Sequence, residues 1–418
     1  MVNTNLFLDD EFTTSGNNMS DLTEKAKALT DITKTNTFPI KKVNFLKFKE
    51  EKENSYIFYE INDFVEMEDI AIRNCVLDEH IFSKNEFSED FFKAAKKTAV
   101  LNVGYEYYIL SQKAMFSIKD KFKADANYMT SFSLPTLLTL REAANNSNEN
   151  IKVIYREVGD IKKIFYVGCE NFCEQLNDMF MIKLLDKLPL EMARELELVK
   201  FTISQENTII YNNFPEIEEE ISKKYKNFNL KPILIAKNSM IGDSSMIFQE
   251  GWQTASGLTL RGNGVAAKHL FKEREKNLFE NKEKEIIEKI KEKIFVDYFE
   301  LPKRFEELSN IEITSEEMTL EEMKFTYESI IEEVIKKCFK TELSRKKKAL
   351  IKERLRNRFT SSEPITALMI VNEFLDIISE LTKKDCSKDI IDKIEKSVSL
   401  IPFFDFEKEL KTINVLSY

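Results

Sequence analysis

The chain is poor in the residues that build common active sites and metal centres. Its 418 residues include two histidines, one tryptophan, five cysteines and nine glycines. His80 and His269 are the only histidines and neither begins an HExxH motif, so multi-histidine metal centres and that class of metalloprotease are excluded. A Gly-x-Ser-x-Gly elbow is also missing. We therefore expect a protein that holds no metal and no cofactor and that is not an enzyme.

Disulfide frameworks, membrane-spanning runs and secretion signals are not expected either. The cysteines are few and widely spaced, and Cys169 and Cys173, one helical turn apart, have no second pair nearby, which favours buried thiols over a zinc site. The most apolar segment, 365–381, is interrupted by polar side chains, as in a buried helix. The first residues show no basic region followed by a long apolar run. We expect a protein of the cytoplasm, or of the host cytoplasm if a phage encodes it.

Glycine and proline are distributed so unevenly that they divide the chain. Residues 1–36 are rich in Thr, Asn, Asp and Ser, which predicts a mobile N-terminal arm. Residues 265–418 contain no glycine and only three prolines, and their apolar residues recur at helical spacing. This pattern predicts an all-helical C-terminal region.

Between these two segments, residues 37–264 show a mixed pattern. Short runs rich in β-branched and aromatic residues predict strands, and Gly159-Asp160 between two of them predicts a tight hairpin. Helical segments lie between the strands without regular βαβ alternation. We therefore predict an α+β domain with a mixed, largely antiparallel sheet, followed by the helical region.

Four of the nine glycines fall within "GWQTASGLTLRGNGVAAKHLF", residues 251–271. The spacing from Gly257 to Gly262 is that of a P-loop, but the lysine and the hydroxyl residue that contact phosphate are missing. Gly262-x-Gly264-x-x-Ala resembles a dinucleotide-binding turn, but no strand ending in an acidic residue follows. The residual hypothesis is an anion-binding helix start formed by Arg261, Gly262, Asn263, Gly264 and Lys268. The alternative is that these glycines only turn the chain from a strand into a helix.

A local basic segment stands out in a chain whose net charge is −10. That net charge excludes a uniformly basic protein that coats nucleic acid, but not a local patch. Residues 345–358 are predicted to form a helix whose cations could contact phosphates: Arg345, Lys346, Lys347, Lys348, Lys352, Arg354, Arg356 and Arg358. The alternative is that this helix pairs with the acidic segment 312–333, which precedes it.

The central segment "KPILIAKNSMIGDSSMIFQEGW" resembles the uncharacterised phage/plasmid-like protein family of mobile elements. Asn238, Ser239, Gly242 and Ser244 would correspond to its Asn-Ser-His-Asp-Gly-Ser-Ser turn, although Met240 and Ile241 replace the histidine and the first aspartate. "LNVGYEYYILSQKAMFSI" is similar to the Gly-x-x-Tyr entry of the same family. The resemblance spans about residues 100–380 and implies a mobile-element origin without implying a reaction.

Three functions follow from these patterns. The first is a non-enzymatic phage- or plasmid-related protein that binds DNA or RNA through the basic helix. The second is a structural protein that assembles with itself or with a host protein through the N-terminal arm and an apolar helix face. The third is a metal-dependent nuclease, because Asp243 and Glu250 flank a turn into a strand, although Trp252 replaces the expected lysine.

Overall fold

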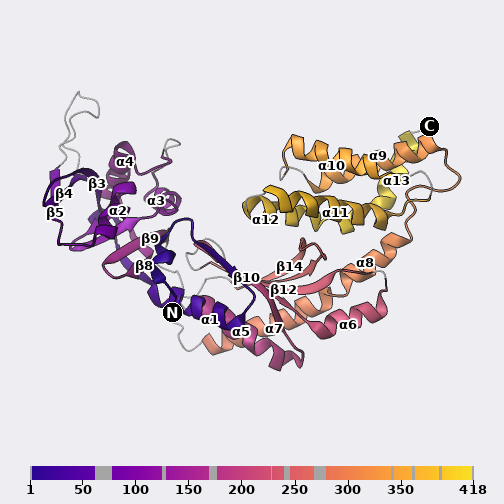
Figure 1. Cartoon of the computed structure of the whole chain (residues 1–418), viewed down its shortest axis with the longest axis horizontal. Coiled ribbons are helices and arrows are strands. Elements are labelled where there is room, and N and C mark those ends of the chain that lie inside the picture. Colours follow the sequence, from indigo (N-terminus) through magenta and orange to yellow (C-terminus); the bar gives the residue numbers. More distant parts are fainter. Residues whose placement is uncertain are drawn as a thin grey trace.

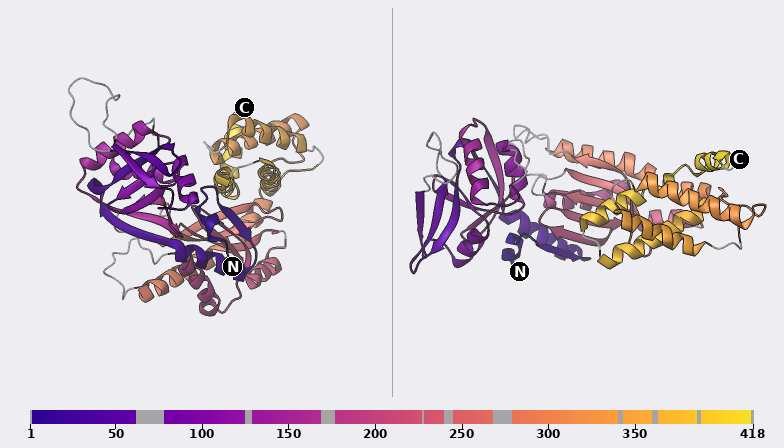
Figure 2. Two further views of the ribbon diagram at one scale, coloured as in Figure 1. Left: turned by 60° about the vertical axis from the view of Figure 1, so that its left-hand side comes forward. Right: turned by 90° about the horizontal axis from the view of Figure 1, so that it is seen from above.

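The computed structural model describes residues 2–61, 78–124, 129–168, 177–226, 228–239, 245–267, 279–339, 343–359, 363–385 and 388–416. Within these ranges the chain forms two β-sheets, followed by a helical C-terminal part (Figure 1). The predicted α+β class is confirmed, since all strands precede the last run of helices. The two sheets lie in separate halves of an elongated molecule (Figure 2). No helix among the described residues is long and apolar enough to cross a membrane.

The first sheet, which we call sheet B, has eight strands. Their order is β2 (Thr33–Pro39), β8 (Asn150–Val158), β9 (Ile161–Gly168), β7 (Glu106–Leu110), β6 (Val100–Val103), β3 (Asn44–Glu51), β4 (Ser55–Ile61) and β5 (Asp78–Ser83). The β7–β9 pair is parallel and the other pairs are antiparallel. The predicted hairpin joins β8 to β9, where Gly159 has a φ of +62° that favours glycine. One face packs on α3 (Ala114–Phe122) and α4 (Leu134–Asn145), and a second cluster includes α2 (Glu89–Lys97).

The second sheet, sheet A, has six antiparallel strands. Their order is β1 (Thr13–Gly16), β10 (Glu197–Ser204), β11 (Thr208–Asn213), β12 (Lys231–Asn238), β13 (Met246–Gln253) and β14 (Thr259–Ala267). One face is covered by α1 (Met19–Ile32), α5 (Asp178–Met192), α6 (Pro215–Lys224) and α7 (Phe279–Asp297), which lie below the sheet in Figure 1. The remaining helices are α8 (Glu300–Ser309), α9 (Leu320–Cys338), α10 (Arg345–Arg358), α11 (Ala367–Asp385), α12 (Lys388–Val398) and α13 (Phe406–Leu416).

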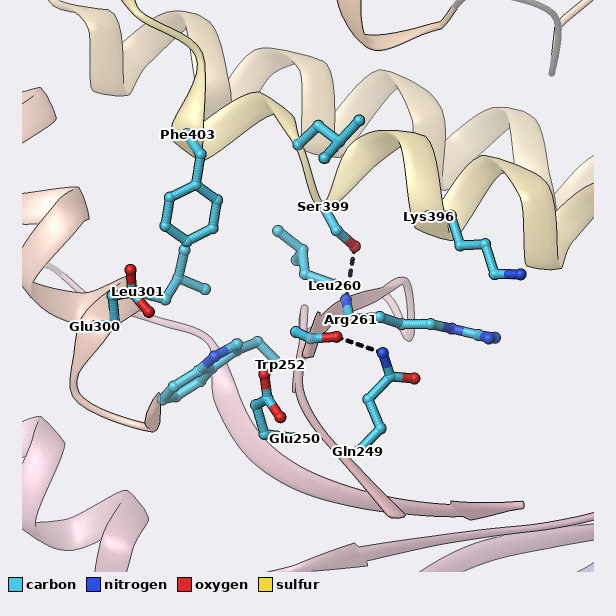
Figure 3. A pocket seen from close by; sticks show the side chains of 12 residues that line it. Gln249, Glu250, Trp252, Leu260, Arg261, Glu300, Leu301, Lys396, Ser399 and Phe403 are labelled. Atoms are coloured by element: carbon cyan, nitrogen blue, oxygen red, sulfur yellow. Dashed lines mark hydrogen bonds between the residues drawn. The ribbon is translucent and has the colours of Figure 1, made fainter. Parts of the chain in front are cut away.

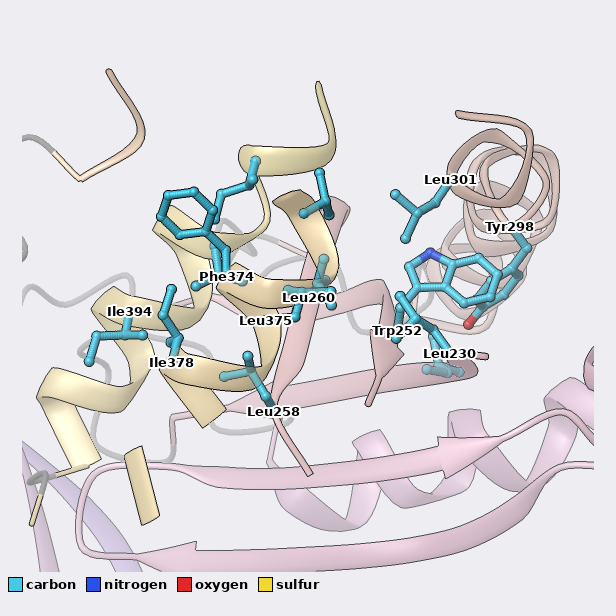
Figure 4. Close-up of a cluster of buried hydrophobic side chains, with 14 of the residues drawn as sticks. Leu230, Trp252, Leu258, Leu260, Tyr298, Leu301, Phe374, Leu375, Ile378 and Ile394 are labelled. Atoms are coloured by element: carbon cyan, nitrogen blue, oxygen red, sulfur yellow. The ribbon is translucent and has the colours of Figure 1, made fainter. Parts of the chain in front are cut away.

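The helical region shares one apolar core with sheet A. Leu258 and Leu260 of the β13–β14 hairpin pack with Leu375, Ile378 and Ile394 of α11 and α12 (Figure 4). α7, the first helix after the sheet, packs against β13 and β14 on the opposite side. The structure therefore differs from the division expected at residue 264, because the last strand continues to Ala267 and a single core spans both parts.

The N-terminal residues are folded into both sheets, so the expected mobile arm is wrong. β1 pairs with β10 at the edge of sheet A, and β2 pairs with β8 at the edge of sheet B. The helix between them, α1, buries Leu22, Ala26 and Leu29. A polar composition suits an edge strand, because its outer face is exposed to solvent and its stability comes from backbone hydrogen bonds. Composition alone does not distinguish such a segment from a disordered one.

A buried polar cluster joins the two sheets where the N-terminal segment crosses between them. Arg156 of β8 is 1% exposed, and its guanidinium donates to the Phe7 carbonyl at 2.9 Å and to the side chain of Gln205, which follows β10. Asp178, at the start of α5, accepts hydrogen bonds from Thr208 and, at 2.8 Å, from Asn238. Burial raises the pKa of Asp178 to about 6, while these hydrogen bonds and the charge of Arg156 oppose the rise.

The raised pKa of Asp178 predicts a specific pH dependence of stability. In the unfolded chain an aspartate has a pKa of about 3.9, so between about pH 4 and pH 6 the folded state binds more protons. The contribution of this group to stability therefore falls as the pH rises through that window, and the full penalty is present above about pH 6.

We expect the difference in unfolding free energy between the wild type and Asp178→Asn to favour the wild type more at pH 5 than at pH 7.5. Urea denaturation at both pH values measures it. Asp31→Asn, at an exposed position of α1, is the matched control. A difference that stays constant between the two pH values would contradict the assignment.

Candidate functional site

The basic segment forms helix α10, as predicted. The hydroxyl of Ser344 accepts a hydrogen bond from the backbone N–H of Lys347 and caps the helix. Ile351 and Leu355 are buried, whereas none of the eight cations is buried and Arg345, Lys346 and Arg356 are exposed. The helix is therefore held by its apolar side, which leaves its charged side for other contacts.

Lys352, Arg354, Arg356 and Arg358 are neutralised within the fold. Arg356 pairs with Glu328 of α9 at 2.6 Å, and Lys352 pairs with Glu332 of the same helix. The alternative of pairing with the acidic segment is thus confirmed for these two cations. Arg354 pairs with Glu380 of α11 at 3.0 Å. Arg358 contacts Glu380 and Asp376 of the same helix. The pairing with α11 was not predicted, because its acids lie outside the acidic run.

The first turn of α10 is different. Arg345 and Lys346 are exposed, and within the described part of the chain neither forms an ion pair. Lys347 and Lys348 follow them directly and are half-buried. The N-terminus of a helix carries partial positive charge, so cations there are unfavourable for the helix itself. The charges of Arg345 and Lys346 therefore do not favour α10 itself.

The predicted anion-binding helix start is wrong, because the glycine-rich stretch is a β-hairpin. β13 and β14 pair in antiparallel register, and Gly257 in the turn has a φ of +91°. Asn263 and Gly264 lie inside β14, so their backbone groups belong to a strand and not to a helix N-terminus. Lys268 lies outside the described residues. The physical reason is that strand pairing with β13 continues to Ala267, and Gly262 permits a close approach of Glu250 and does not form a turn.

Arg261 is also committed to the fold. Its guanidinium binds the Glu395 carboxylate of α12 at 2.7 and 3.2 Å, and both side chains are at most 10% exposed. Its backbone N–H donates to the hydroxyl of Ser399 at 2.6 Å. These contacts fasten α12 to the edge strand of sheet A. The positive charge that was assigned to anion binding is therefore compensated by a carboxylate of the same chain.

A cavity of about 410 Å³ lies beside this junction (Figure 3). It opens between the β13–β14 hairpin, the start of α8 and the segment that follows α12. Its lining combines apolar and aromatic side chains with polar and charged ones: Gln249, Glu250, Trp252, Leu260, Arg261, Gly262, Glu300, Leu301, Lys396, Ser399, Leu400 and Phe403. A cavity of this size and composition is typical of a small-ligand site.

Glu250 is the buried acid of this cavity. Glu250 is only 3% exposed. Burial raises the pKa of Tyr298, and the charge of Glu250 raises it further. Gly262 makes room for it, because a Cβ at that position would collide with the carboxylate of Glu250. The register of the β13–β14 pair shifts at a bulge between Gln249 and Gly251, and this shift brings Glu250 and Gly262 together. Glycine at residue 262 is thus explained by a close approach to a carboxylate.

Only one of the two acids of the nuclease alternative lies within the described residues. Glu250 lines the cavity beside Trp252, while Asp243 lies outside the described residues, as do Cys169 and Cys173. Within the described ranges, no group of three or more His, Cys, Asp or Glu side chains could hold a metal ion. The family resemblance depends on four turn residues. Asn238 and Ser239 are buried at the end of β12, while Gly242 and Ser244 lie outside the described residues.

Comparison with known proteins adds no relative from which a function could be transferred. No family model, no curated protein and no solved structure matches the chain. Two features of the structure remain to indicate a function: the first turn of α10 and the cavity beside Glu250.

Proposed function

We propose that the protein is a non-enzymatic, phage- or plasmid-related protein that binds nucleic acid through the first turn of α10. One observation carries the proposal: four consecutive cations start this helix, and the first two, Arg345 and Lys346, are exposed and form no ion pair within the described residues. Cations at this end of a helix repel one another and oppose the macrodipole. A row of phosphates is a partner that would compensate them.

The proposed contact surface is smaller than the one expected from the sequence. Lys352, Arg354, Arg356 and Arg358 are held by acids of α9 and α11, so releasing them for phosphate would break ion pairs. Arg345 and Lys346 are exposed and form no ion pair within the described residues, so we assign binding to this first turn, in which Lys347 and Lys348 lie beside them. We expect weak, salt-sensitive affinity from so few phosphate contacts.

The test is fluorescence anisotropy with labelled single- and double-stranded DNA and with RNA between about 50 and 200 mM salt. The variant replaces all four cations, Arg345, Lys346, Lys347 and Lys348, with glutamine. We expect its affinity at the lowest salt to fall about tenfold or more, and the slope of log affinity against log salt to become shallower by about 3.6 for duplex DNA.

A charge-matched control separates local binding from the overall charge of the protein. It replaces four exposed lysines of other elements with glutamine and changes the net charge by nearly the same amount: Lys93, Lys123, Lys223 and Lys231. This control should bind as the wild type does. The proposal fails if the wild type binds no nucleic acid at low salt, or if the two variants lose affinity equally.

The assembly-protein alternative was based on an N-terminal arm and an apolar helix face, and the first of these does not hold. Its N-terminal arm is paired into both sheets, so it does not extend toward another molecule. The large apolar side chains that are exposed on the helices, such as Leu320 and Phe325 of α9, are ordinary features of a protein surface when they occur singly. A dimer or larger species in light scattering would nevertheless favour this alternative.

A further inference from the structure

The cavity beside Glu250 is divided into two ends with different chemistry. In Figure 3, Trp252, Leu301, Phe403 and the two acids Glu250 and Glu300 lie toward one end. Arg261 and Lys396 lie toward the other end. The guanidinium of Arg261 is paired with Glu395, so its charge is compensated. Lys396 is exposed and extends away from the two acids in this view.

The acidic end is suited to an organic cation. Faces of aromatic rings attract ammonium and guanidinium groups, and a carboxylate in a partly dehydrated site strengthens that attraction. Trp252 and Phe403 supply the rings, and Glu250 supplies a carboxylate that is almost fully buried. Anions would be repelled by the two acids at this end, and a bare metal ion would find no cluster of three ligands in the described residues.

The apolar walls indicate the rest of the ligand. Leu260, Leu301 and Leu400 line the cavity, and Leu400 and Phe403, at 54% and 50% exposed, leave apolar surface accessible at its rim. An aliphatic stem of several carbons would cover this surface while its charged head reaches Glu250. Gly262 leaves the space that this carboxylate occupies, since a Cβ there would collide with it.

We propose that this cavity binds an alkylammonium or alkylguanidinium group, with the cationic head at Glu250 and Glu300 and the stem along the leucines. The group could be supplied by a free polyamine or by a lysine or arginine side chain of another protein. Both sources present the same chemistry to the cavity, so one experiment can test the site and then separate them.

The cavity contains its own reporter. Trp252 is the only tryptophan of the chain, so a change in its fluorescence on titration reports on this site alone. The full-length protein is titrated at constant ionic strength with agmatine, spermidine and the peptide acetyl-Gly-Lys-Gly-amide, and with butyrate as an anionic probe. We expect a saturable change with a Kd of about 1 mM or lower for at least one cation and no saturable change with butyrate.

Saturation with agmatine or spermidine identifies a free polyamine as the source of the cationic group. Saturation with the peptide alone identifies a protein side chain as the source. Either result supports the site. Glu250→Gln should weaken the Kd about tenfold. If that variant unfolds, Glu300→Gln, at an exposed position, should weaken the Kd severalfold, while Glu306→Gln, exposed on the same helix, should not change it. The proposal is overturned if no cation saturates, if butyrate gives the same response, or if both cavity variants bind like the wild type.

Discussion

Replacing Arg156 with methionine is expected to lower the free energy of unfolding by about 3–5 kcal/mol, which is the usual cost of removing one partner from a buried charged network. The guanidinium satisfies the carbonyl oxygens of Phe7 and Gln205 and stacks on Phe165, with 4.5 Å from its central carbon to the ring centre. Methionine fills a similar volume but donates no hydrogen bond. The Gln205 carbonyl would lose this donor, the Phe7 carbonyl would keep only the hydrogen bond from the Gln205 side chain, and the charge of Asp178 would lose its compensation.

The effect of Arg156→Met should be structural and located at the junction of the two sheets. Denaturant unfolding measures its size, and hydrogen exchange should show faster opening of β1 and β2, which the N-terminal segment contributes to the two sheets. Lys34→Met is the matched control, because Lys34 on the same strand pair is half-exposed and pairs with Glu157 at the surface. Its cost should stay below about 1 kcal/mol. Equal costs for the two variants would contradict the role assigned to Arg156.

The second large effect is expected from Glu395→Gln. Glutamine keeps the size of the side chain but removes the charge that compensates Arg261, and both residues are at most 10% exposed. We expect a loss on the order of 3 kcal/mol, since a buried charge then loses its carboxylate. Because this pair fastens α12 to β14, hydrogen exchange should accelerate in these two elements more than in sheet B.

The control for this variant is Glu380→Gln. Glu380 also forms ion pairs with two arginines, Arg354 and Arg358, but its side chain is 56% exposed. Water replaces a surface ion pair at little cost, so we expect less than about 1 kcal/mol. If Glu395→Gln is as mild as Glu380→Gln, the helical region is held to sheet A by apolar packing alone and the ion pair adds nothing.

The sequence predicted those parts of the fold that depend on neighbouring residues. The hairpin at Gly159 follows from β-branched runs on both sides of a turn, and α10 follows from the helical spacing of its apolar residues. Such signals are local, since the residues that carry them contact one another. The α+β class followed in the same way from the order of strands and helices.

Contacts between distant residues could not be predicted in this way. Arg261 and Glu395 lie in elements separated by more than a hundred residues, and nothing in either segment indicates the other. The glycines of residues 251–271 were assigned to a turn because glycine permits both unusual backbone angles and close packing. At residue 262 the second reason applies, and only the position of Glu250 reveals it. The cavity was missed for the same reason, because its lining comes from three separate stretches of the chain.

The way in which β1 and β2 complete the two sheets also has a consequence for synthesis on the ribosome. β1 is made early, but its partner β10 begins at Glu197, which at 5–20 residues per second is made roughly 10–40 s later. Until then the segment that will close the edge of sheet A has no strand to pair with, and Arg156 has not yet met Gln205. The residues of β1 therefore reach their final contacts well after they emerge. During this interval the nascent chain carries an unpaired strand that a chaperone, or the same strand of another nascent chain, could bind.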